Sequence, residues 1–226
     1  MIKYSDYTVF DMDTQVIVNT VNCKGVMGAG LALEFKLRYP EMFRDYRKRC
    51  KQNMVKPGRP YLFNELKPWI LNFPTKYHWR YPSRIEWIEE GLRYFAQNYH
   101  RMNIRSIAFP KLGCRNGGLD WSVVKPVMEK YLASLDIEVF ICLDEKPKPW
   151  GVEDRMIKLL NKIKEDIAYR TKVQSDIGIR GDVLCEVVKK LPVTRFREIR
   201  RIRGMGKGYY EKIFVYFYHQ VVGEKT

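Results

Sequence analysis

Two glycine-rich segments could hold a phosphate group through their backbones. They are KGVMGAG at residues 24–30 and GCRNGGL at residues 113–119. Glycines allow close approach to a diphosphate and leave backbone N–H groups pointing at it. Each segment lies between a predicted strand and a predicted helix, which is where open α/β sheets bind ligands. We therefore expect both loops to hold one diphosphate, although tight turns alone would explain any single glycine.

The first loop does not fit a nicotinamide dinucleotide site. In GAGLAL, residues 28–33, Leu33 stands where the third glycine of that fingerprint belongs. No clear strand ending in an acidic residue follows about twenty positions later. A Walker lysine motif is also missing, so these two nucleotide-binding classes are excluded.

An asparagine and a lysine lie at the ends of predicted strands. Asn22 ends QVIVNTVN, and its amide could bind a ribose hydroxyl or satisfy nearby backbone in a turn. Lys76 follows WILNFP in a segment rich in aromatic residues: Phe73, Tyr77, His78 and Trp79. An amine desolvated by aromatics has a lowered pKa and can attack an anomeric carbon or act as a base. The alternative is a solvated surface lysine, one of 41 basic residues.

The elements that position these residues alternate between strand and helix. This alternation predicts an α/β fold, a sheet with helices on both faces. Ser83 and Glu86 form a predicted capping box for the helix that follows, and Asp120 is expected to cap the helix after the second loop. The predicted strands are 15–22, 59–64, 69–74, 105–112 and 136–143, and the predicted helices are 31–39, 41–50, 85–99 and 121–135.

The charged, proline-bearing stretch at 144–154 predicts a boundary between two domains, 1–148 and 155–226. Strands disappear beyond it, and 155–171 reads as a helix, so the second domain is expected to be small and all-helical. Residues 189–212 contain nine Lys or Arg and two Asp or Glu. The whole chain of 226 residues has a formal net charge of +15. Such an excess favours contact with nucleic acid, although a basic proteome or a membrane surface would also produce it.

Composition narrows the remaining classes. Five scattered cysteines and three histidines without shared spacing indicate reduced thiols and no metal site. No organic cofactor is implied either. No apolar run approaches the ~18 residues of a membrane span, and MIKYSDYTVF has no apolar signal stretch. We therefore expect a cytoplasmic protein.

Three segments taken together resemble a known family. VNTVNCKGVMGAGLALEFK, ILNFPTKYHWR and IAFPKLGCRNGGLDW are similar, in this order, to blocks of macrodomains across about residues 5–143. The similarity is strongest to the DarG-like subgroup, antitoxins that remove ADP-ribose from DNA. The resemblance implies a mixed sheet sandwiched by helices, ADP-ribose as ligand and Lys76 as the catalytic residue. It further implies ligand contacts by Thr8, Asn22, Gly25, Val26, Met27, Gly28, Ala29, Gly30, Thr75, Leu112, Gly113, Cys114, Arg115, Asn116, Gly117, Gly118 and Leu119.

The sequence departs from other macrodomains at two of these positions. Gly117 aligns with the catalytic aspartate of eukaryotic enzymes that release ADP-ribose from glutamate, which favours the DNA-directed subgroup. Thr8 aligns with an aspartate that often holds the adenine amine, so recognition of adenine stays open.

The second domain resembles the HRDC domain of RecQ-type helicases and ribonuclease D. The similarity lies in LCEVVKKLPVTRFREIRRIRGMGKGYYEKI, with Leu-Pro before a short helix and Ile-Arg-Gly-Met-Gly-Lys before the last one. The resemblance implies contact with nucleic acid or protein; a solvated basic face is the alternative. The residues expected to contact phosphates are Arg200, Arg201, Arg203, Gly204, Gly206 and Lys207.

We expect a hydrolase that removes ADP-ribose from DNA, with a basic tail that contacts nucleic acid. The resemblance also implies a partner protein, a cognate ADP-ribosyltransferase toxin. Three alternatives remain: a reader that binds ADP-ribose without cleaving it, an enzyme acting on ADP-ribosylated protein, and a tail that binds a partner protein.

Overall fold

The computed structural model describes residues 1–146 and 149–223. The chain divides into two compact units, Met1–Glu145 and Lys146–Thr226, each described here by itself. Residue 148, where the first domain was expected to end, lies outside the described residues, as do residues 224–226 of the second.

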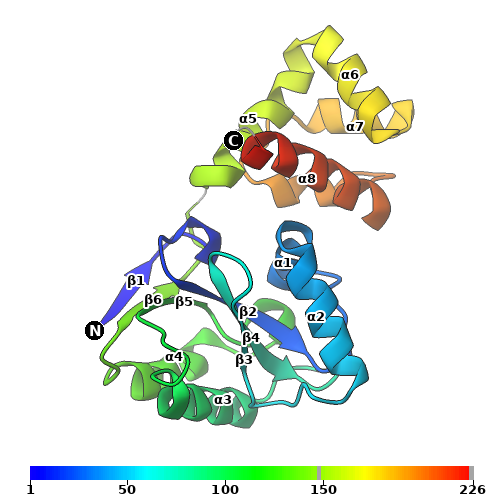
Figure 1. Ribbon diagram of the computed structural model, residues 1–226. Helices are drawn as coiled ribbons and strands as arrows, with labels where there is room; N and C mark the ends of the chain where they lie inside the picture. The colour runs from blue at the N-terminus through cyan, green and yellow to red at the C-terminus, as the bar shows by residue number, and fades with distance from the viewer. Residues whose placement is uncertain (147–148, 224–226) are drawn as a thin grey trace. The chain divides into compact units, whose positions relative to one another are not determined.

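A six-stranded mixed sheet forms the centre of the first unit (Figure 1). Its strand order is β1-β6-β5-β2-β4-β3, and all neighbours are parallel except the antiparallel pair β3 and β4. The sequence analysis did not predict β1, because an edge strand of four residues is too short for its alternation to be distinctive. The strands are β1 (Ile2–Ser5), β2 (Val16–Asn22), β3 (Tyr61–Phe63), β4 (Trp69–Lys76), β5 (Ser106–Pro110) and β6 (Glu138–Cys142).

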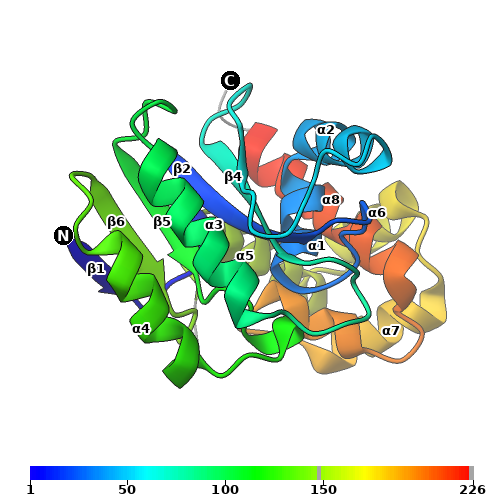
Figure 2. The same ribbon diagram turned by 90° about the horizontal axis from the view of Figure 1, so that it is seen from below.

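Helices cover both faces of this sheet (Figure 2). They are α1 (Gly30–Arg38), α2 (Pro40–Lys51), α3 (Ile85–Asn98) and α4 (Trp121–Leu132). The alternation of β2 shows how the faces are divided, because Val16 and Val18 pack with α3 and α4, whereas Ile17 packs with α1 and α2. The expected α/β sandwich is confirmed.

One of the two expected helix caps is wrong. Helix α3 begins at Ile85, with Arg84 at the N-cap position and no side-chain cap. In a capping box Glu86 would accept from the Ser83 N–H, but this N–H instead donates to the carbonyl of Gly117 at 2.8 Å. Ser83 is thereby tied to the second loop, and its hydroxyl makes no hydrogen bond with any described residue. The other expectation is confirmed: Asp120 caps α4 by accepting from the Ser122 N–H at 2.7 Å.

The described part of the second unit is helical. Its helices are α5 (Gly151–Glu165), α6 (Ile167–Ile177), α7 (Gly181–Lys190) and α8 (Gly206–Gly223), with a 3₁₀ turn at Phe196–Arg201. The single helix expected at 155–171 is broken at Asp166, whose carboxylate instead caps α6 by accepting from the Tyr169 N–H at 2.8 Å. No helix within the described residues is long and apolar enough to cross a membrane.

Candidate active site

The carboxyl ends of three neighbouring strands bring the predicted residues to one edge of the sheet. Strand β2 ends at Asn22 and β4 ends at Lys76, and these two residues are register partners beside a shift in the ladder. The second loop follows β5, which adjoins β2 on the other side. Residues separated by more than ninety positions, such as Asn22 and Asn116, thus meet where ligands bind in sheets of this kind.

The Lys76 side chain points to the second glycine-rich loop. Its Nζ donates a hydrogen bond to the backbone carbonyl of Asn116. Burial lowers the pKa of this amine, in the direction expected from the sequence. Two aromatic neighbours that were expected to surround it, Tyr77 and Trp79, are 52% and 47% exposed. Neither ring is therefore buried with the amine.

Asn22 is 7% exposed, and its side chain organises the first loop. Its Nδ2 donates to the Val26 carbonyl at 2.6 Å, and its Oδ1 accepts from the Lys24 N–H at 2.8 Å. Tyr46 donates to the Asn22 carbonyl at 2.7 Å. The turn-forming role considered for this asparagine is thus present. An amide has two donor hydrogens and two acceptor lone pairs, so these contacts leave capacity for a ribose hydroxyl.

The first loop presents backbone to the edge of the sheet. Gly25 and Gly30 have φ values of +74° and +56°, in the left-handed region that favours glycine. Helix α1 starts at Gly30, and Ala29 at its N-cap makes no side-chain hydrogen bond to the first turn. Uncapped N–H groups at a helix N-terminus suit an anion. Val26 is 38% exposed, whereas Met27 is 2% exposed and packs into the core, so only the backbone of Met27 is available to a ligand.

The second loop is a compact turn held from several sides. The Leu119 N–H donates to the Gly113 carbonyl at 3.1 Å and closes the loop. The guanidinium of Arg115 forms an ion pair with Asp144, which anchors the loop to the segment after β6. Leu112 is fully buried, so its side chain belongs to the core rather than to a ligand contact.

The two loops touch each other. A Cβ added to Gly30 would lie 2.5 Å from Nδ2 of Asn116, and a Cβ added to Gly117 would lie 2.7 Å from Oγ of Ser83. Both distances are shorter than the contacts that Cβ atoms make, so the Asn116 amide or the Ser83 hydroxyl would have to move. Gly117 therefore has no room for an aspartate unless Ser83 moves, which gives a physical reason for the departure seen in the sequence.

Two further predicted contacts lie near this edge. At the start of a 3₁₀ turn, Asp11 Oδ2 accepts from the N–H and the Oγ1 of Thr8, at 3.0 and 2.7 Å. Thr75 is 3% exposed at the end of β4. In the second loop, Cys114 is partly buried and packs against the core, and Gly118 is exposed with a φ of +80°. Ligand contact by these residues, and by Gly28, stays a prediction.

Tyr46 and Ser83 support the site in ways that the sequence did not predict. Tyr46 is fully buried and fixes the end of β2, and Ser83 ties the start of α3 to the second loop. No motif marks Tyr46, and the capping pattern at Ser83 does not indicate its contact with the second loop, because each residue acts on a segment distant in the sequence. The residues of the second unit that were predicted to contact phosphates lie around the start of α8. Arg200, Arg201 and Arg203 are exposed, and Gly204 and Gly206 have positive φ. Lys207 Nζ lies 3.9 Å from Glu211 Oε1.

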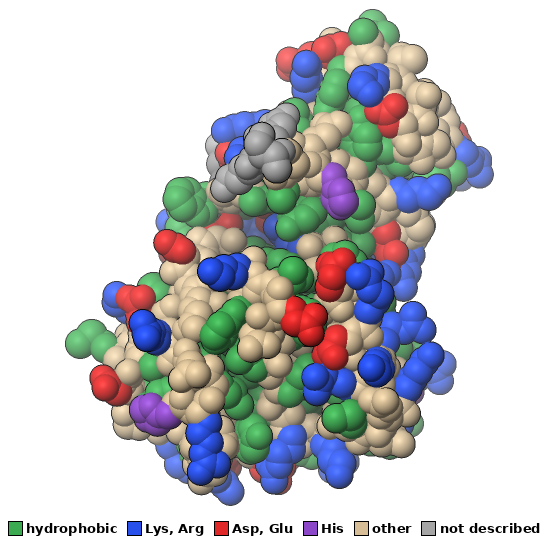
Figure 3. All heavy atoms as spheres, in the orientation of Figure 1, with side chains coloured by type: hydrophobic (Ala, Val, Ile, Leu, Met, Phe, Trp, Pro, Cys, Tyr) green, Lys and Arg blue, Asp and Glu red, His purple; other side chains and the backbone are tan. Residues whose placement is uncertain are grey.

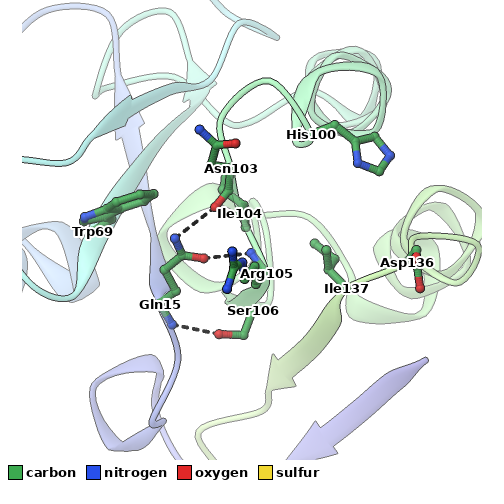
Figure 4. Close-up of a pocket in the computed structure, with 9 residues that line it drawn as sticks. All are labelled: Gln15, Trp69, His100, Asn103, Ile104, Arg105, Ser106, Asp136 and Ile137. Carbon is green, nitrogen blue, oxygen red and sulfur yellow. Dashed lines mark hydrogen bonds between the residues drawn. The ribbon is translucent and has the colours of Figure 1, made fainter.

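A cavity of about 790 Å³ lies at the opposite edge of the sheet, where the parallel strands begin (Figure 4). Gln15 crosses it, donating to the Asn103 carbonyl at 3.0 Å and accepting from the Arg105 N–H at 2.7 Å. No predicted site residue lines this cavity. Within the described residues, no group of three or more His, Cys, Asp or Glu could hold a metal ion.

Comparison with known proteins agrees with the geometry at the loop edge. The Macro domain family matches residues 18–128. The DNA ADP-ribosyl glycohydrolase of Mycobacterium tuberculosis is 46% identical over 129 residues, which cover 55% of this chain and 37% of that protein. The chain thus spans less than half the length of the curated relatives it matches.

Two solved structures extend the similarity to three dimensions. The macrodomain of Thermus aquaticus DarG is 39% identical, with a TM-score of 0.60 over 63% of this chain and 98% of that one. Thermosipho africanus DarTG, in complex with ADP-ribose, is 37% identical, with a TM-score of 0.61 over 66% of this chain and 43% of that one. With this identity over nearly the whole of a solved macrodomain, the chain belongs to the macrodomain family.

Proposed function

We propose that the first unit removes ADP-ribose from ADP-ribosylated DNA and that Lys76 is the reactive residue. The observation that carries the proposal is the position of this amine. Lys76 ends β4 opposite Asn22, its Nζ reaches the second loop, and burial lowers its pKa. A lysine that loses its proton more easily than usual, beside two loops suited to a diphosphate, is equipped for glycoside chemistry.

Lys76 can contribute in two ways. As a base, the unprotonated Nζ takes a proton from water while the water oxygen bonds to the anomeric carbon. As a nucleophile, Nζ itself bonds to that carbon, and water later displaces the lysine. In both routes the bond from the anomeric carbon to the DNA base breaks, its electron pair leaves with the base, and water supplies the hydroxyl of free ADP-ribose. The Asn22 amide orients the sugar hydroxyls in both.

We propose that the second unit is an HRDC-like module that brings the enzyme onto nucleic acid. Lys and Arg side chains are spread over both units on the face shown in Figure 3. In the second unit, Arg200, Arg201, Arg203 and Lys207 are exposed around the N-terminus of α8, which suits unspecific phosphate contacts. A Thermosipho africanus relative, a fusion of a DNA ADP-ribosyl transferase with a DNA ADP-ribosyl glycohydrolase, supports a further proposal, that a cognate ADP-ribosyltransferase is a partner.

The test is release of ADP-ribose from a single-stranded oligonucleotide that carries one ADP-ribosylated base. We expect release by the wild type and a loss of at least ~100-fold in Lys76→Ala, the scale of a missing acid–base group. Wild-type protein that binds free ADP-ribose without releasing any from DNA would contradict the proposal. ADP-ribosylated protein as the substrate, or a reader without activity, would then remain.

A further inference from the structure

An exposed aromatic segment lies directly beside the proposed catalytic lysine. Of the Phe, Trp and Tyr residues that the structure describes, five are exposed, and three of these fall within residues 77–81. Tyr77 is 52% exposed, Trp79 is 47% exposed and Tyr81 is 66% exposed. Solvent-exposed rings gathered in this way mark a binding surface rather than a core.

Both ends of this segment are attached to the second loop. Lys76 donates to the Asn116 carbonyl before it, and the Ser83 N–H donates to the Gly117 carbonyl at 2.8 Å after it. Within the segment, the Tyr81 N–H donates to the His78 carbonyl at 3.2 Å. The aromatic rings therefore project from a fixed turn on the rim of the proposed site.

The charge around the rings is positive. Residues 67–84 contain four Lys or Arg and no Asp or Glu. Lys24 Nζ lies 4.2 Å from the centre of the Tyr77 ring, and the Arg80 guanidinium lies 4.8 Å from the centre of the Trp79 ring. His78 stacks on Trp79, with ring centres 5.4 Å apart. Exposed rings interleaved with cations are the elements of a surface for single-stranded nucleic acid, where bases stack and phosphates pair.

We infer that residues 77–81, which we term the aromatic rim, bind the unpaired nucleotides that flank the ADP-ribosylated base. This inference rests on the proposed function and assigns how that site selects its substrate. Trp79 and Tyr81 stack on flanking bases, while Lys24 and Arg80 meet the adjoining phosphates. Base faces are accessible to these rings only when the strand is unpaired, so the rim selects single-stranded DNA.

The first experiment compares two substrates, an ADP-ribosylated nucleoside and a short oligonucleotide that carries the same modified nucleoside at its centre. The full chain is used, as wild type, Trp79→Ala, Tyr81→Ala and Trp79→Phe. Tyr4→Ala is the matched control, because Tyr4 is also exposed, at 43%, but lies on β1 at the far edge of the sheet. The readout is kcat/KM for the oligonucleotide divided by kcat/KM for the nucleoside.

We expect this ratio to fall about tenfold in Trp79→Ala, the loss of one base–aromatic stack. Trp79→Phe should restore most of it, and Tyr4→Ala should leave it unchanged. An unchanged ratio in Trp79→Ala and Tyr81→Ala, or an equal fall in Tyr4→Ala, would refute the inferred role of the aromatic rim. Neither result would contradict the proposed function.

A second measurement separates the rim from catalysis. Fluorescence anisotropy of an unmodified labelled oligonucleotide reports binding even where no ADP-ribose is released. Wild type should bind the single strand about tenfold more tightly than Trp79→Ala does, whereas the two proteins should bind a duplex hairpin equally. Binding of the single strand that is insensitive to Trp79, or an equal loss for the duplex, would refute the inference.

Discussion

Gly30→Ala tests the contact between the two loops. Gly30 has a φ of +56°, and a Cβ there would lie 2.5 Å from Nδ2 of Asn116. The substitution therefore has two separable costs, backbone strain in the first loop and displacement of a side chain in the second.

The structure sets the size of each. Alanine in the left-handed region costs about 1–2 kcal/mol, reduced by up to ~1 kcal/mol because alanine also restricts the unfolded chain. Moving the exposed Asn116 amide off its preferred rotamer adds roughly 0.5–1.5 kcal/mol. We expect Gly30→Ala to lower the free energy of unfolding by about 2 kcal/mol, with about half of the loss removed when Asn116 is truncated.

A double-mutant cycle measures the second cost alone. Wild type, Gly30→Ala, Asn116→Ala and the double variant are unfolded in urea and followed by tryptophan fluorescence, to which the first unit contributes four of the five tryptophans. The expected coupling between the two positions is about 1 kcal/mol in the direction of rescue. ADP-ribose affinity, measured by calorimetry, should weaken in Gly30→Ala and recover partly in the double variant.

Gly25→Ala is the matched control. Gly25 lies in the same loop with a φ of +74°, but its added Cβ meets Cys50 at an ordinary 3.5 Å and does not approach Asn116. This variant should show the strain without coupling to Asn116→Ala. Additive behaviour of Gly30→Ala with Asn116→Ala, or equal coupling at Gly25, would refute the proximity of the loops.

Three further predictions address the lysine, the core and the tail. Burial lowers the Lys76 pKa, so the rate of ADP-ribose release should rise with pH and then level off, and the midpoint of the rise should lie below the ordinary lysine pKa of about 10.4. Lys76→Arg should lack this rise, and a wild-type midpoint at or above the ordinary value would contradict the prediction. Gly91→Ala should lower the free energy of unfolding, measured in urea, by about 1–2 kcal/mol. Its Cβ would lie 2.3 Å from the buried ring of Phe73, and the cost of this overlap exceeds the gain from the higher helix propensity of alanine. In the tail, the exposed basic residues are replaced by glutamine at Arg200, Arg201, Arg203 and Lys207. The slope of log Kd for single-stranded DNA against log salt concentration should fall by about 0.7 for each phosphate that is no longer neutralised. An unchanged slope would favour a protein partner.

The sequence by itself determined the features that depend on local patterns. Alternation of strands and helices predicted the α/β sandwich, and positive φ values occur at glycines of both predicted loops, such as Gly25 and Gly113. Asp120 was recognisable as a cap because a cap acts on N–H groups two or three residues away. Such signals lie within a few residues of the structure they specify, so a single sequence contains them.

Tertiary structure decided what depends on distant segments. Ser83 has the residue type of a cap, yet the second loop holds its backbone, and the edge strand β1 exists only by pairing with β6. The pairing of Asn22 with Lys76 and the contact of Gly30 with Asn116 join segments far apart in the chain. The exposure of Trp79 is likewise set by how a turn is anchored at both ends. Each of these outcomes depends on which of several competing long-range contacts has the lower free energy. Residue types and their spacing do not determine that order.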